Sequence, residues 1–490
     1  MNVDVSSADP LAVETDLLCW MVTEESTGVS GLGEDHALAP AVRQSLGDLR
    51  GRFAKTTAVA NPGGSPPRML IAGLGPGSKI TADTIRHVAG AISKRAQELG
   101  VARFAVVCPD VSGVDPGDAA GQITEGCSLA LYDFDAYRSK KAEAEPDLTV
   151  VCGADVAGAV ARAGAVSDGV RFARDVANMP PNECPPAGLA DVARGMADEK
   201  RIKCTVLSAA QLSEGGFGGI MAVGKGSDNP PRLIVMEYGG GEGPPVALVG
   251  KAVTFDTGGI SLKPGEKMDE MKFDKCGGCT VLGIMRAAAE VGLPLNIVGV
   301  IPSVENMPGG GSYRPGDIVR LYGGKTAEIL NTDAEGRLIL ADALSYVEER
   351  FSPRCIIDFA TLTGACIVAL GCNVAGMVSD SDDMAASVLL SADRTAERVW
   401  RLPLDEDYMD MIKSKVADIK NLGTGRAAGT IAAAAFLKSA IKDTPWLHLD
   451  IAGTAWMQPA SKKRPYNPPG ATGFGVRLIL DYLGRIAPGR

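Results

Sequence analysis

The amino-acid sequence predicts an α/β protein of two domains, a smaller N-terminal α/β domain and a larger C-terminal α/β domain around a central mixed sheet. Three observations support this fold class. The chain has 490 residues, a length typical of two domains. Apolar strand-like segments alternate with segments of helical spacing. The proline-rich stretch NMPPNECPP (178–186) interrupts the alternation, so we expect domains at 1–164 and 165–490.

The first domain contains a strand–helix–strand pattern. RMLIAGLG (68–75) is an apolar strand that runs into a glycine turn, and ARFAVVC (102–108) is the next strand. Between them, apolar residues recur at helical spacing over 80–99, with Thr81 as the expected N-cap and Gly100 as the stop. Two strands joined through a helix predict a parallel sheet.

The second domain opens with a predicted linker helix, SDGVRFARDVANM, from about residue 165. Apolar strand candidates then recur, with helical stretches such as TVLGIMRAAAEVG and TIAAAAFLKSAIK between several of them. The strand candidates are 232–238, 245–250, 295–301, 355–360 and 446–452. This pattern predicts a buried mixed sheet between helices.

The amino-acid composition argues against several classes of protein function. A net charge of −10 argues against a nucleic-acid partner, which a basic face would favour. The first residues are acidic and lack a positive n-region and an apolar h-region, so we expect no signal peptide. We also expect no membrane span, because no apolar run reaches the required length. The eleven cysteines lack regular spacing and fit free thiols in a reducing cytoplasm. Only three histidines are present, which argues against histidine-rich metal sites and favours chemistry based on carboxylates, lysine and arginine.

Three weaker motifs have structural interpretations. The segment 219–226 resembles a phosphate-binding loop but lacks the Ser or Thr that would hold magnesium. The glycines of 73–77 fit tight packing between a strand and a helix better than a phosphate cradle. The CxxC pair at 276–279 has no second pair to complete a zinc cluster, so we expect small packed residues at the start of a helix.

Two charged clusters stand out against apolar or glycine-rich surroundings. In 249–275, Lys251 and Asp256 follow an apolar strand, Lys263 comes after a glycine turn, and Asp274 opens the next segment. Charges buried in such a setting must be paired or must bind metal. Lys251 and Asp256 are an odd number of residues apart, so they can share a face only if the strand bends or bulges between them.

The second cluster is NTDAEGR (331–337). In a turn or an extended segment, Asp333 and Glu335 lie on one side of the chain, and a helix is expected to begin near Arg337, where it would favour an anion. The clusters together carry enough negative charge for two divalent cations and a hydrolytic reaction. Ordinary ion-paired loops are the alternative, and spacing leaves phosphoester, amide and other substrates open.

Six stretches resemble the leucyl aminopeptidase family, the dinuclear-metal cytosolic aminopeptidases. They occur in the family's order within 165–490, which the resemblance makes the catalytic domain. The stretches are VGKAVTFDTGGISLKP (249–264), MKFD (271–274), NTDAEGRLILADAL (331–344), DFATLTGA (358–365), ADIKNLGTGRAAGTIAAAAFL (417–437) and HLDIAGTAW (448–456).

The resemblance implies a role for each key residue. Lys263 and Arg337 correspond to the catalytic lysine and arginine, and the arginine would hold a bicarbonate that acts as general base. The residues that would shape the pocket for the first side chain of the peptide are Met271, Leu362 and Gly364. The resemblance also implies that this pocket prefers apolar side chains, leucine among them. The implied ligands of two divalent ions, zinc, manganese or magnesium, are Lys251, Asp256, Asp274, Asp333 and Glu335.

The resemblance also implies peptide substrates, a cytoplasmic homohexamer and no membrane partner. Another two-metal hydrolase, or a non-catalytic scaffold or DNA-binding role, remains the alternative. Three residues depart from the family's usual pattern: Lys275 stands where methionine is usual, Ala252 where glycine is usual, and Cys279 where alanine is common. Lys275 places a positive charge beside the expected site.

Overall fold

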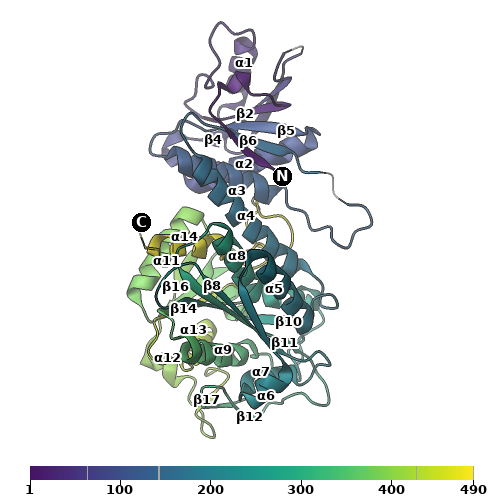
Figure 1. The fold of residues 1–490 in the computed structure, drawn as a ribbon, viewed down its shortest axis with the longest axis vertical. Coiled ribbons are helices and arrows are strands. Elements are labelled where there is room, and N and C mark those ends of the chain that lie inside the picture. Colours follow the sequence, from purple (N-terminus) through teal and green to yellow (C-terminus); the bar gives the residue numbers. More distant parts are fainter. Residues whose placement is uncertain (63, 142–143, 426, 489–490) are drawn as a thin grey trace. The chain divides into compact units, whose positions relative to one another are not determined.

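The computed structural model of the chain describes residues 1–62, 64–141, 144–425 and 427–488 (Figure 1). It divides into two compact units. The first comprises Met1–Asp168 together with the short segment Lys463–Pro468. The second comprises Gly169–Lys462 and the residues from Pro469 onward. The division falls within helix α4 (Ala157–Asn178), which begins about eight residues before the predicted linker helix.

Within its described residues, the first unit contains a six-stranded sheet in the order β1-β6-β5-β2-β4-β3. All neighbouring strands are parallel except β3 and β4. The elements of this unit are β1 (Val3–Ser6), η1 (Pro10–Ala12), β2 (Leu17–Thr23), α1 (Ala39–Leu49), β3 (Thr56–Ala60), β4 (Arg68–Gly75), η2 (Gly77–Lys79), α2 (Ala82–Glu98), β5 (Arg103–Val107), α3 (Pro116–Ala130) and β6 (Asp147–Val151).

The predicted strand–helix–strand pattern of this unit is confirmed. Thr81 caps α2 by accepting a hydrogen bond from the backbone N–H of Thr84, and the Thr84 side chain accepts one from Thr81 in return. This reciprocal pair satisfies two N–H groups that a helix N-terminus otherwise leaves open. Gly100 follows the helix with a φ of +64°, a conformation that glycine adopts at little cost.

The second unit is built on a larger mixed sheet of nine strands among its described residues, in the order β16-β15-β18-β14-β9-β11-β8-β7, with β10 paired to β11. The central strands are parallel, whereas β15 and β8 run antiparallel to their inner neighbours. The strands are β7 (Lys203–Leu207), β8 (Arg232–Gly239), β9 (Val246–Gly250), β10 (Ala252–Asp256), β11 (Asn296–Asn306), β14 (Cys355–Ala360), β15 (Ala375–Ser379), β16 (Val399–Arg401) and β18 (Trp446–Asp450).

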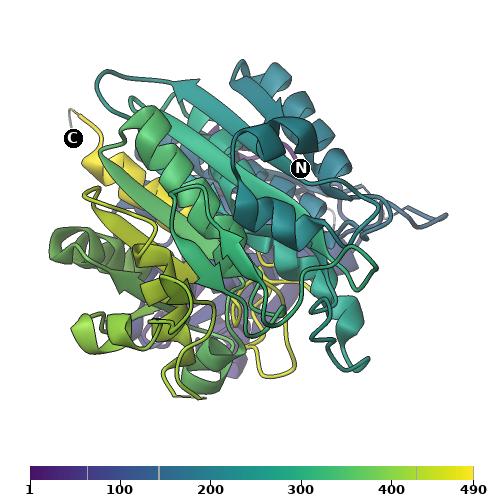
Figure 2. The same cartoon turned by 90° about the horizontal axis from the view of Figure 1, so that it is seen from below.

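Helices cover both faces of this sheet (Figures 1 and 2). Helices α9 and α13 lie on one face, where Leu338, Ala341 and Leu344 pack with Val249 and Val300 of the sheet. Helix α8 lies on the other face, beside α5 and α14. The helices are α5 (Pro186–Lys200), α6 (Ala209–Glu214), α7 (Gly218–Gly224), α8 (Cys276–Glu290), α9 (Gly336–Phe351), α10 (Gly364–Leu370), α11 (Asp382–Thr395), α12 (Glu406–Asp410), α13 (Gly429–Lys438) and α14 (Val476–Ile486).

Three short strands and one 3₁₀ helix complete the second unit. The strands are β12 (Ile318–Arg320), β13 (Thr326–Glu328) and β17 (Ile419–Lys420), which form a small separate sheet, and the 3₁₀ helix is η3 (Met268–Lys275). All five predicted strands of the domain are present. The segment that resembles a phosphate-binding loop is mostly helical, as α7, so it does not form such a loop.

Strand β11 runs five residues beyond its predicted end at 301, through Pro302. Proline cannot donate to a strand ladder and is normally excluded from a central strand. Here β11 pairs with β9 up to Val300 and with β10 from Ser303 onward. Pro302 therefore lies between the segment of β11 that pairs with β9 and the segment that pairs with β10. On that edge of β11 no backbone N–H is required at this position.

Asp342 joins α9 to α7. Its carboxylate is completely buried and accepts hydrogen bonds from the backbone N–H groups of Ile220 at 2.9 Å and Tyr322 at 2.8 Å. Burial raises its pKa to about 7, although the backbone donors oppose the shift. The carboxylate thus fixes the start of α7 and the turn at Tyr322 against α9, the helix that follows NTDAEGR.

In the described part of the chain, no helix combines the length and the apolar character that crossing a bilayer requires.

Candidate metal centre

The charged residues of both sequence clusters come together at one end of the large sheet. Lys251 follows β9 and Asp256 ends β10, while Asp274 belongs to η3 and Asp333 and Glu335 precede α9. Clefts beyond the carboxyl ends of parallel strands are the usual ligand sites of such sheets. All ten predicted site residues line one cavity of about 560 Å³: Lys251, Asp256, Lys263, Met271, Asp274, Asp333, Glu335, Arg337, Leu362 and Gly364.

A β-bulge accounts for the odd spacing of Lys251 and Asp256. The register of β10 against β11 shifts between Val253 and Phe255, which leaves Thr254 as an extra residue. A bulge of this kind re-aims the side chains that follow it. Both charged groups consequently line the same cavity, and the predicted bend or bulge is confirmed.

Lys251 lies at the buried floor of the site. Its Nζ is 2.8 Å from Asp274 Oδ1 and 2.8 Å from Glu335 Oε1, and it donates to the carbonyl oxygen of Thr361 at 3.0 Å. Burial disfavours the charged amine, but the surrounding carboxylates outweigh burial and raise its pKa. Gly336 permits this placement, because a Cβ there would lie 2.6 Å from Cε of Lys251.

Lys263 lies on the open side of the same cluster. Its Nζ is 2.8 Å from Asp256 Oδ2 and also contacts Asp333 Oδ1. The side chain is 22% exposed, whereas that of Lys251 is 3% exposed. Burial opposes the charge of Lys263, yet Asp256, Glu335 and Asp333 raise its pKa above that of an ordinary lysine. Lys263 is therefore an ammonium group with access to a molecule in the cavity.

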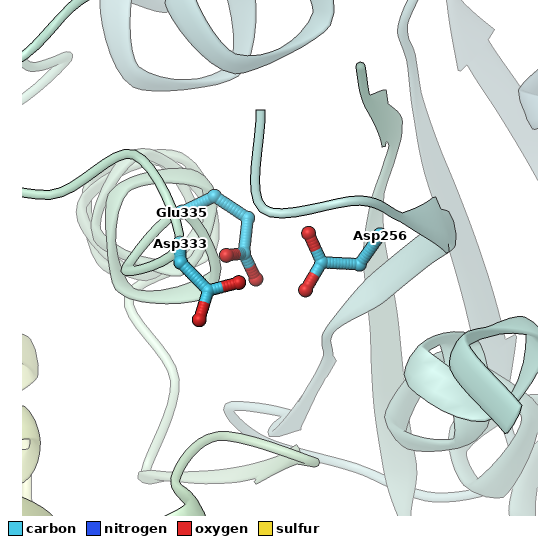
Figure 3. A group of neighbouring side chains, drawn as sticks. All are labelled: Asp256, Asp333 and Glu335. Atoms are coloured by element: carbon cyan, nitrogen blue, oxygen red, sulfur yellow. The ribbon is translucent and has the colours of Figure 1, made fainter. Parts of the chain in front are cut away.

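The carboxylates of Asp256, Asp333 and Glu335 point toward one another (Figure 3). One oxygen of each lies within 4.8 Å of the others. Burial raises the pKa of Asp274 to about 8, and the nearby carboxylates add to that shift while Lys251 opposes it. Burial and the charge of Asp256 likewise raise the pKa of Glu335.

In this cavity, two buried carboxylate oxygens of the described residues have no hydrogen-bond partner, Oδ2 of Asp274 and Oε2 of Glu335. An unsatisfied acceptor of this kind costs free energy unless a ligand meets it. Clustered carboxylate oxygens with unused lone pairs are the donors that divalent cations such as manganese and magnesium prefer. The donor set therefore fits divalent metal ions.

Two supporting residues were missed by the sequence prediction. Asn306 donates through Nδ2 to Asp256 Oδ1 at 2.8 Å, and Thr361 donates through Oγ1 to Asp274 Oδ1 at 2.7 Å. Such contacts orient the carboxylates that face a metal. Thr361 lies within the stretch DFATLTGA and could have been proposed, whereas Asn306 is a single amide at a strand end without a motif.

Arg337 is the second residue of α9, and its buried side chain lines the cavity. It donates to the carbonyl oxygen of Asn421 at 2.8 Å, and its Nε has no partner among the described residues. Burial lowers its pKa to about 10, although Glu335 and Asp450 oppose the shift, so the guanidinium stays charged at neutral pH. An available N–H at a helix N-terminus suits a small anion.

Comparison with known proteins identifies the family. The model of the cytosol aminopeptidase family catalytic domain matches residues 171–480, and that of its N-terminal domain matches residues 36–141. The chain belongs to the cytosol aminopeptidase family. The resemblance of the six stretches is thereby confirmed, and so are the fold class of two α/β domains and the enzyme class, an aminopeptidase.

Relatives of this family match almost the entire chain. A probable cytosol aminopeptidase of Cenarchaeum symbiosum is 58% identical over 486 residues, which cover 99% of each chain. A cytosol aminopeptidase of Pseudomonas aeruginosa is 43% identical over 498 residues, again with 99% of each chain covered. The solved bottromycin maturation enzyme BotP in complex with Mn has a TM-score of 0.86 at 34% identity, covering 96% of this chain and 99% of its own.

The pocket beside the carboxylates combines apolar and polar walls. Met271, Leu362 and Gly364 line it together with Trp456, which stacks on Phe273 with ring centroids 5.6 Å apart. Trp456 Nε1 also donates to Glu270 Oε2 at 3.1 Å, which fixes the indole in place. The family stretch 417–437 contributes Leu422 and Gly429 to the wall, while Arg426 within it lies outside the described residues.

Proposed function

We propose that the chain is a two-metal aminopeptidase that releases apolar N-terminal residues, leucine among them, from peptides. The observation that carries the proposal is the convergence of four carboxylates in one cavity with two buried oxygens left unpartnered. The solved BotP, which shares this fold, is a complex with Mn, and this supports a divalent ion here. Manganese, zinc and magnesium all suit a mixed set of carboxylate and amine donors.

The five residues at the floor and rim of the cavity would hold the ions. When bound, two divalent ions lower the pKa of a water molecule, polarise a carbonyl and bind the free α-amine of a peptide. Lys251 would ligate as a neutral amine, because two dications beside it would displace the proton that the carboxylates otherwise hold there. The ligands are Lys251, Asp256, Asp274, Asp333 and Glu335.

Lys263 is proposed to stabilise the transition state. Its ammonium faces the cavity and remains charged, so it can donate to the carbonyl oxygen of the scissile peptide bond. Negative charge grows on that oxygen as the tetrahedral state forms, and a fixed donor there lowers the barrier. Lys251, being buried and held by three acceptors, cannot take this role.

Arg337 is proposed to hold a small anion, bicarbonate, whose oxygens can accept the proton of the attacking water. The unpartnered Nε and the start of α9 both favour an anion at this place. The guanidinium offers the fork geometry that planar oxyanions bind.

The apolar preference is proposed from the wall that faces the first side chain. Met271 and Leu362 supply flexible apolar surface, and Gly364 adds no side chain, so a leucine has room. We also propose a cytoplasmic location, which the eleven free cysteines support, because free thiols persist in a reducing compartment.

The deciding experiment compares a leucyl peptide with its N-acetylated twin, after chelation and again after manganese or zinc is restored. Cleavage of the free-amine peptide alone, restored by metal, is the expected result. Cleavage of both peptides would contradict the role of the α-amine and favour another two-metal hydrolase. Absence of cleavage across several first residues would favour a non-catalytic role, which a salt-dependent DNA titration would then test.

A further inference from the structure

Lys275 is a buried lysine directly after Asp274, and the proposed chemistry gives it no task. Its side chain is completely buried. No carboxylate lies within ion-pair distance of it among the described residues, and its titratable neighbours are the thiols of Cys279, Cys184 and Cys276 and the ammonium of Lys272. Such a setting solvates a charge poorly, so the ammonium depends on the hydrogen bonds that it donates.

The ammonium of Lys275 binds two backbone carbonyl oxygens from separate segments. It donates to Met179 O at 2.9 Å and to Lys272 O at 2.6 Å. Met179 directly follows the last residue of α4, where carbonyl groups lack helical partners and the helix dipole favours a cation. Lys272 lies in η3, three residues before Lys275. The ammonium thus connects the end of α4 to η3.

The segment η3 carries two residues of the candidate site, Met271 and Asp274. A segment of 3₁₀ helix has weaker internal hydrogen bonds than an α-helix and depends on its surroundings for its exact position. The contact from Lys275 to Met179 supplies such an external constraint. It acts one residue away from the carboxylate that meets Lys251 at 2.8 Å.

We propose that Lys275 is a positioning residue, a tethered cation that fixes η3 against the end of α4 and so aims the Asp274 carboxylate into the metal site. The proposal rests on the proposed metal-binding function. A methionine would fill similar space without burying an unpaired charge, so packing alone does not account for lysine. What lysine adds is the charged link between two carbonyl groups.

The test measures stability and metal affinity separately. In Lys275→Met, the melting temperature of the metal-free protein should equal or exceed that of the wild type, because a buried charge is removed. Its manganese affinity, from a calorimetric titration, should fall about tenfold, as for the loss of a residue that orients a ligand. At saturating manganese, kcat should approach the wild-type value. A drop in both stability and affinity would mean a merely structural role and would overturn the proposal.

A second variant tests the charge itself. Lys275→Ala leaves both carbonyl groups and room for an ion, and carbonyl oxygens coordinate K⁺ in place of water. Potassium should therefore restore part of its manganese affinity, whereas tetramethylammonium should not. The manganese affinity of the wild type and of Lys272→Met should not respond to potassium. Lys272→Met is the matched control, because it removes a charge from the same segment at a half-buried side chain that lies over Phe273.

Unchanged manganese affinity in both Lys275 variants, or a response to potassium in the wild type, would refute the tethered-cation role. Failure of the proposed function has a different signature. A wild type that binds manganese but cleaves no peptide would refute the aminopeptidase proposal, and the affinity comparison would still decide the role of Lys275.

Discussion

At the scale of single residues, the two lysines of the centre differ in what surrounds them. Lys251 is enclosed by two carboxylates and a carbonyl, while Lys263 keeps one side toward the cavity. These different surroundings support the two proposed roles, Lys251 as an amine ligand and Lys263 as a charged donor to substrate.

Lys263→Ala separates these tasks. We expect the variant to keep its metal content, because the ligands remain, and to lose activity by about 10²- to 10³-fold, as when one donor to a developing oxyanion is removed. Metal analysis and kcat on a leucyl substrate measure the two quantities. The exposed surface lysine Lys413, replaced by alanine, is the control. Activity within a few-fold of wild type would rule out the carbonyl role.

The sequence was informative about residues whose spacing is fixed by a motif, and uninformative about those that act only through the fold. Asp333, Glu335 and Arg337 lie within seven residues, so local geometry already groups them. Asn306 reaches the centre only after distant strands pair, and a lone amide has no sequence pattern that would announce this.

At the scale of elements, helix α9 organises the centre and is itself tied down by Asp342. The raised pKa of this carboxyl predicts a pH dependence. The unfolded chain releases this proton near pH 4 and the folded chain near pH 7, so between these values the folded state binds more protons. The free energy of unfolding should then fall as pH rises from 4 to 7, by about 4 kcal/mol in total from this group.

Asp342→Asn removes this titration. Compared with the wild type, the metal-free variant should show a smaller decrease in the free energy of unfolding between pH 4 and 7, as measured by urea titration. Asp191→Asn, which changes an exposed carboxylate, should keep the wild-type slope. Equal slopes in Asp342→Asn and wild type would contradict the assignment.

Strands were easier to predict than helix starts. Apolar runs such as CIIDFA match β14 residue for residue, because burial on both faces demands a continuous apolar run. Helix α4 begins earlier than expected because Gly158 and Gly164 weaken the local helical signal, and tertiary packing overrides that preference. The extension of β11 through Pro302 depends on a gap between β9 and β10 that no local pattern encodes.

At the scale of the whole molecule, we propose the homohexamer that the family resemblance implies. The second unit exposes large apolar side chains, among them Val368 at 91% and Trp400 at 63%. A subunit contact would bury such side chains, which makes them sites at which the assembly can be tested. Light scattering should give six times the 50.7 kDa of one chain. Val368→Glu should lower that mass if α10 lies in a contact, and a wild-type mass of a single chain would refute the assembly.

The two-domain organisation was predicted from the proline-rich stretch after α4. The sequence did not predict that the short segment Lys463–Pro468 belongs to the first unit. The assignment of this segment to the first unit depends on long-range packing. In sequence the segment looks like any other exposed loop.

The buried thiols have a consequence for which metals can poison the enzyme. Cys276 lies two residues after Asp274, and burial raises its pKa to about 12, so it keeps its proton at cellular pH. To bind this sulfur, a soft ion such as cadmium or mercury must reach a buried position and displace the thiol proton. Although eleven cysteines are present, the five proposed ligands offer toxic soft ions only oxygen and nitrogen donors. Soft ions should therefore react more slowly with Cys276 than with an exposed thiolate of ordinary or lowered pKa.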